Sequence, residues 1–108
     1  MRLVELIQYF RQGGSYEQFC LSHSLKPDAE AVEIYMEKPF DLNNQLAFFE
    51  IEKTNGSIEF SANGLMYYSL FDFYYFLDVI KESNRIDSKT LTTEEIARKL
   101  LFFAINDA

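Results

Sequence analysis

Apolar and polar positions alternate with helical spacing at the start of the chain. Between residues 3 and 10 an apolar residue recurs every three or four positions, and Gly13-Gly14 then ends the pattern. Residues 15–18, Ser-Tyr-Glu-Gln, have the S-x-x-Q form of a capping box. The pattern therefore predicts two short helices separated by the glycine pair, the second ending near Ser24.

Residues 27–38 fit two patterns. Pro27 in a first-turn position and the acidic residues that follow it favour a helix, with apolar residues at 29, 32 and 36 on one side. Val32, Ile34 and Met36 also alternate with polar or amphipathic residues, as in a strand. We expect a third helix to about residue 37 but keep the strand as the alternative; Pro39 ends either element.

Residues 46–61 predict a β-hairpin. Apolar and charged residues alternate on both sides of Asn55-Gly56, the pair favoured in two-residue turns because both central residues need positive φ. Asn63-Gly64 is a second turn signal, and residues 65–68 can add a third short strand.

The remaining pattern is helical. Residues 70–82 are apolar on most sides, which predicts a central buried helix capped by Ser69. Residues 84–92 form a polar connection, and residues 93–106 form a final helix. The sequence thus predicts an α+β fold, with helices before and after a small antiparallel β-meander, in a single domain of residues 1–108.

The composition is typical of a folded domain with one core, and its negative charge is concentrated in one region of the chain. The 108 residues are 48% hydrophobic and 17% aromatic, far from the composition of a disordered chain. The net charge is −7, and the stretch 28–78 holds ten acidic residues against two lysines. This balance argues against nucleic-acid binding, since acidic residues in segment 27–38 would be repelled by phosphates.

No export signal or membrane span is expected. Glu5, Gln8 and Arg11 interrupt the first apolar stretch, and Asp72 and Asp78 interrupt the longest one. The single cysteine cannot form an internal disulfide and fits a reducing compartment. We expect a cytoplasmic protein without membrane association.

The sequence predicts neither catalysis nor a cofactor. Cys20 and His23 lie three residues apart on a predicted helix, where a thiolate–imidazole pair could form, but they share a stripe with core aromatics. With one His and one Cys, a zinc site is not expected. The fragment 41–44 is too short for a calcium loop. We therefore expect a binding protein, with no metal.

The predicted hairpin gives the first candidate binding surface. Its register places Glu50, Glu52 and Glu59 on one face of the sheet, with Glu52 directly opposite Glu59. Facing like charges destabilise a strand pair. A basic partner would neutralise them, although solvation or a neighbouring lysine would also account for the pair.

The predicted central helix gives the second candidate binding surface. In that register Phe71, Tyr75, Asp78 and Glu82 fall on one face beside the inner stripe. Tyrosine offers a large contact area, and acidic neighbours attract Arg or Lys of a partner. The alternative is that these side chains meet the protein's own basic residues and final helix.

The stretch Asp72-Phe73-Tyr74-Tyr75 resembles the Asp-then-Tyr-Tyr element of bacterial immunity proteins that neutralise toxin nucleases. The chain also looks like the immunity proteins of contact-dependent-inhibition and polymorphic-toxin systems in being small, acidic and cysteine-poor. This resemblance implies a bacterial protein that neutralises a basic toxin stoichiometrically, without turnover. The expected partner-binding residues are Glu50, Glu52, Glu59, Phe71, Asp72, Tyr75, Asp78 and Glu82.

Two alternatives remain open. The first is a homo-oligomeric structural or adaptor protein, including a homodimer, that buries the aromatic helix and the final helix. Leu101, Phe102 and Ile105 are left over beyond the inner stripe of the final helix and would suit it. The second is a small enzyme.

Overall fold

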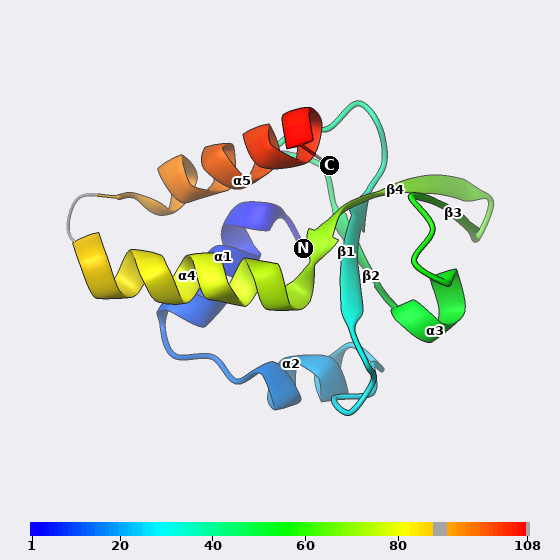
Figure 1. The fold of residues 1–108 in the computed structure, drawn as a ribbon, viewed down its shortest axis with the longest axis horizontal. Helices are drawn as coiled ribbons and strands as arrows, with labels where there is room; N and C mark the ends of the chain where they lie inside the picture. Colours follow the sequence, from blue (N-terminus) through cyan, green and yellow to red (C-terminus); the bar gives the residue numbers. More distant parts are fainter. Residues whose placement is uncertain (88–90, 108) are drawn as a thin grey trace.

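A computed structural model describes residues 1–87 and 91–107 (Figure 1). The α+β class, with helices before and after a small antiparallel sheet, is confirmed. The helices are α1 (Leu3–Arg11), α2 (Tyr16–Ser22), α3 (Ile51–Thr54), α4 (Phe73–Asp87) and α5 (Thr93–Asp107). The strands are β1 (Val32–Met36), β2 (Leu46–Glu50), β3 (Glu59–Ala62) and β4 (Leu65–Asp72).

The first two helices and the last one form where local patterns predict them. The apolar stripe of α1 is buried, and Gly13 after it has a φ of +91°. The Ser15 side chain accepts a hydrogen bond from the Gln18 backbone N–H at 3.3 Å, which confirms it as the cap of α2. Helix α5 begins at Thr93 as expected. Part of the predicted connection 84–92 lies outside the described residues.

Segment 27–38 contains strand β1, so the expected third helix is wrong and the strand alternative is confirmed. Val32, Ile34 and Met36 join the main core, while Tyr35 is fully buried on the opposite face of the strand. Pairing with β2 and β4 on both sides satisfies the backbone of β1. These tertiary contacts outweigh the weak local helix signals, which lie mostly in the loop before the strand.

The predicted hairpin at 46–61 is also wrong. The chain leaves β2 at Glu50 and forms α3, whose end is Asn55-Gly56, with φ of 54° and 71°. An Asn-Gly pair with positive φ can end a helix as readily as it can form a tight turn, and here it does the former. The predicted register of this hairpin, with Glu52 opposite Glu59, is therefore wrong as well, because Glu59 pairs with Tyr68.

The hairpin of the second turn signal is present instead. Asn63 and Gly64, with φ of 53° and 79°, join β3 to β4, which extends the predicted third strand to residue 72. Helix α4 consequently begins at Phe73 rather than at residue 70. Asp72, not Ser69, caps it, since its Oδ1 accepts the Tyr75 backbone N–H at 2.8 Å.

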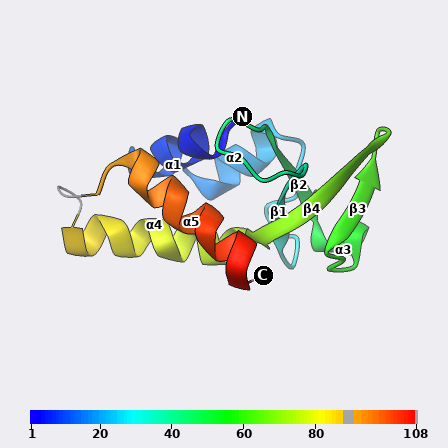
Figure 2. The same ribbon diagram turned by 90° about the horizontal axis from the view of Figure 1, so that it is seen from above.

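The sheet order is β2-β1-β4-β3, with every neighbouring pair antiparallel. Helices α1, α4 and α5 extend from one side of the sheet, while α3 and the β3–β4 hairpin lie at the other end (Figures 1 and 2). Phe73 lies at the centre of the core with no exposed surface. The rings around it belong to Phe10, Tyr16, Phe19, Phe48 and Phe76.

The second face of the sheet carries its own aromatic cluster. Phe49 of β2 and Phe60 of β3 are 4.8 Å apart between ring centroids, although β2 and β3 are the two outer strands. The Tyr35 ring packs against both, and its hydroxyl donates to the Ser57 carbonyl at 2.6 Å. The sheet is therefore strongly curled, with the two outer strands brought together over this cluster.

Candidate protein-binding surfaces

The three glutamates of the predicted hairpin do not share a face of the sheet. Glu50, at the end of β2, is buried, and its Oε2 accepts the Lys26 backbone N–H at 2.7 Å. Glu52 lies exposed on α3, and its Oε2 accepts the Glu30 backbone N–H at 3.2 Å. Both carboxylates therefore fasten the loop before β1 to the β2–α3 junction, while Glu59 is exposed on the far outer strand.

The five residues predicted near the central helix are also divided. Phe71 belongs to β4, not to the helix, and is buried. Tyr75 is half-buried and stacks on Phe103 of α5 at 4.6 Å, with an interplanar angle of 22°. Asp72, Asp78 and Glu82 are exposed. The structure thus brings Phe71 and Tyr75 together, as expected, but as packing between β4, α4 and α5.

The acidic side chains of the stretch 28–78 are mostly exposed to solvent. Of its ten acidic residues only Glu50 is buried, and Glu33 is half-buried. Within the part of the chain that the structure describes, none of the ten forms an ion pair. The ion pairs Arg2–Glu5 and Arg98–Glu94 lie outside the stretch. Ion pairs among the described residues therefore do not neutralise its negative charge.

A further surface, the α5 groove, was predicted only in part, through Leu101, Phe102 and Ile105 of the final helix. We use this name for two adjoining hollows, of about 410 and about 450 Å³, that lie between α5 and the loop joining β1 to β2. Phe40 and Ile105 line both hollows. The larger apolar side chains of the groove are Phe40, Leu42, Ile58, Tyr68, Leu101, Phe102 and Ile105.

The groove holds several of the strongly exposed apolar side chains. Ile58 is 72% exposed, Phe102 68% and Ile105 58%. Apolar side chains that gather on one surface with this exposure are typical of protein interaction sites. In the sequence, the groove is indicated only by the excess of apolar residues on the final helix. Phe40 and Tyr68 could not be assigned to it, because only the tertiary fold brings them beside α5.

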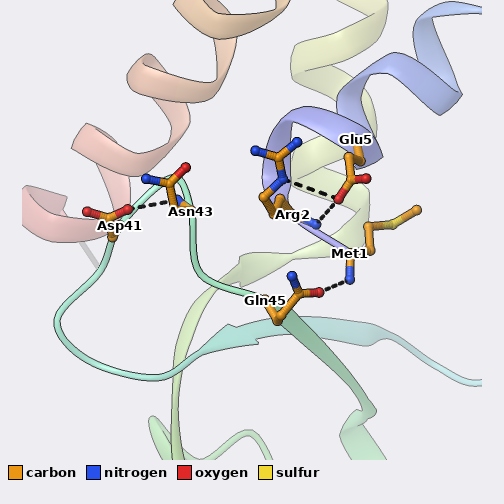
Figure 3. A network of polar contacts seen from close by, with 6 residues as sticks. All are labelled: Met1, Arg2, Glu5, Asp41, Asn43 and Gln45. Carbon is orange, nitrogen blue, oxygen red and sulfur yellow. Dashed lines mark hydrogen bonds and ion pairs between the residues drawn. The ribbon is translucent and has the colours of Figure 1, made fainter.

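Hydrogen bonds fix the loop wall of the groove. Asp41 Oδ1 accepts the Asn43 backbone N–H at 2.7 Å, and this turn lies beside α5 (Figure 3). Asn44 Nδ2 donates to the Pro39 carbonyl at 2.8 Å. At the end of the loop, the Met1 amino group donates to Gln45 (Figure 3). The wall is thus organised before any partner binds.

Cys20 and His23 do not form a nucleophile–base pair in the described structure. Cys20 is fully buried, and burial raises the pKa of its thiol, as does the nearby Glu50 carboxylate to a smaller extent. His23 is exposed, stacks on Phe19 at 4.0 Å, and places Nδ1 3.0 Å from the Phe19 carbonyl. The thiol is therefore held in its protonated form, away from solvent.

We expect Cys20 to react slowly with thiol reagents. At pH 8 a thiol with a raised pKa has little thiolate, and burial blocks access, so iodoacetamide should label native Cys20 about 100-fold or more slowly than the denatured chain. Labelling followed by intact-mass measurement checks this. Equal rates in the two states would show that the α2 region opens freely.

Among the described residues, no group of three or more His, Cys, Asp or Glu side chains is placed to hold a metal ion. No helix in the described part of the chain has the length and apolar character needed to span a membrane. Comparison of the chain with protein-family models, curated proteins and solved structures found no match.

Proposed function

We propose that this protein is a non-catalytic binding protein that neutralises a basic protein partner by forming a stoichiometric complex. The observation that carries the proposal is that most acidic side chains of the stretch 28–78 are exposed and that none of them forms an ion pair within the described structure. Unneutralised charge of one sign speeds the approach of a partner of opposite charge. The resemblance to toxin-immunity proteins supports a basic toxin, such as a nuclease, as that partner, met in the bacterial cytoplasm.

The contact surface is expected to include Glu52 and Glu59, with Asp72 and Asp78 on the side of α4. All four are exposed. The buried Glu50 and Phe71 would act indirectly, by holding the loop before β1 and the start of α4 in place. Tyr75 would contribute through the exposed part of its ring.

The direct test uses the product of the gene adjacent to the one encoding this chain. The proposal expects that product to be basic, to form a 1:1 complex measurable by calorimetry, and to lose its toxicity on binding. A neighbouring product that is not basic or does not bind contradicts the assignment as an immunity protein.

Charge-neutral variants test the surface. The double variant Glu52→Gln with Glu59→Gln should lower the association rate about 10-fold at low salt, because steering depends on exposed charge. The amide introduced by Glu52→Gln retains an oxygen that can accept the Glu30 N–H, so the fold should be unchanged. Stopped-flow association kinetics at two salt concentrations provide the measurement.

The matched control is Glu5→Gln with Glu94→Gln. It removes the same total charge, but from two carboxylates that Arg2 and Arg98 already neutralise. The control should therefore associate nearly as fast as the original protein. Equal slowing in both double variants would assign the effect to net charge and not to the proposed surface.

A further inference from the structure

The α5 groove is chemically distinct from the acidic surface. Its lining holds two basic residues, Lys38 and Arg98, and one acidic residue, Asp41, in a protein whose net charge is −7. Arg98 is already paired with Glu94 at the same helix. The groove itself therefore offers a basic partner no local electrostatic attraction, in contrast to the acidic surface.

The groove contains both projecting side chains and the hollows to receive them. Phe102 and Ile105 stand out from α5, and the smaller hollow beside them is lined by Phe40, Ile58 and Tyr68. Its volume of about 410 Å³ can accommodate an aromatic side chain. A projecting side chain beside a hollow large enough to hold it allows a self-complementary contact, which is the requirement for a two-fold symmetric dimer.

Charge favours a second copy of the chain at this place. Two molecules of charge −7 repel each other, and the repulsion is smallest where the facing surfaces carry little negative charge. Lys38 adds a positive charge whose nitrogen lies 4.5 Å from the Tyr68 ring centroid, and it forms no ion pair within the described structure. The groove is thus a surface on which an acidic molecule can dock.

We infer that the protein forms a homodimer through the α5 groove, with Phe102 of each copy inserted into the partner copy's hollow. Asp41 of the acidic stretch lines the groove, but Glu52, Glu59, Asp72 and Asp78 do not, so these four carboxylates can still bind a basic protein. The inference does not rest on the proposed function, since it concerns a different surface.

Sedimentation velocity over a range of concentrations tests the dimer. The original protein should sediment as a dimer, and Phe102→Asp should raise the dissociation constant by about 30-fold or more, as expected for a central interface aromatic. Ile58→Asp, on a different segment and similarly exposed, should have the same direction of effect. Circular dichroism should show that both variants stay folded.

The matched control is Leu21→Asp. Leu21 is 58% exposed, as Ile105 is, but lies on α2 and does not line the groove. This variant should remain dimeric. A monomeric original protein, dimers that persist in both groove variants, or a control that dissociates equally would each overturn the inference.

The salt dependence of association distinguishes this dimer from a complex with a basic partner. Between about 0.1 M and about 1 M NaCl the Debye length falls from about 10 Å to about 3 Å, so repulsion between the two acidic copies is screened. The dimer should become tighter or stay unchanged, whereas a complex with a basic protein should weaken. A dimer that dissociates as salt rises would contradict a predominantly apolar interface.

Discussion

Phe73→Ala should lower the free energy of unfolding by about 3–5 kcal/mol, which is the cost of removing a buried aromatic side chain and leaving a cavity. Phe73 has no exposed surface, and its ring contacts rings from α1, α2, β2 and α4. The neighbouring elements cannot all move inward at once, so little of the cavity should close. Urea unfolding followed by circular dichroism gives the free energy.

Tyr74→Ala is the control for this substitution. Tyr74 is the next residue of the same helix and is 47% exposed. Removing its aromatic side chain should therefore lower the free energy of unfolding by less than about 1 kcal/mol. Similar losses in the two variants would mean that α4 is rotated from the position described above, and that the core does not centre on Phe73.

Glu50→Ala should lower the free energy of unfolding by about 1–3 kcal/mol, because it removes a hydrogen bond to a buried, charged acceptor. The donor is the Lys26 backbone N–H, which lies 2.7 Å from Glu50 Oε2. Glu50→Gln retains an oxygen acceptor and should recover most of that loss. Thermal unfolding of the two variants at the same pH and salt concentration measures the difference.

Glu52→Ala provides the comparison at an exposed site. Glu52 makes a similar bond to the Glu30 N–H, but at 3.2 Å and in contact with water, so its loss should cost less than about 0.5 kcal/mol. A folded Glu50→Gln protein that no longer binds a basic partner would show that Glu50 contacts the partner, and would contradict its role as a structural acceptor.

The helices at the two ends of the chain could be predicted because their signals are local. The stripe of α1, the Ser15 cap and the acidic first turn of α5 each lie within a few residues of what they determine. The strands could not be placed with the same success. Asn55-Gly56 and Asn63-Gly64 both favour positive φ, and only the tertiary fold decides that the first ends a helix and the second turns a hairpin.

The candidate surfaces show the same division between local and tertiary information. The acidic stretch is visible in the sequence because charge is a property of composition. The wrong register, however, placed Glu52 opposite Glu59, and the carboxylate of Glu50 proved to be buried. The α5 groove joins residues 38–43, 58, 68–69 and 98–105, which no short-range pattern connects.

The curl of the sheet bears on how any partner can bind. Free outer strands in a flat sheet offer unpaired backbone groups to which a foreign strand can add. Here the outer strands are five and four residues long, and the Leu46 N–H on the β2 side already bonds the Met1 carbonyl at 2.8 Å. Because Phe49 and Phe60 draw these strands toward each other, little straight backbone edge is left to extend. Recognition should therefore proceed through side chains, and the same geometry should protect the protein against strand-mediated aggregation.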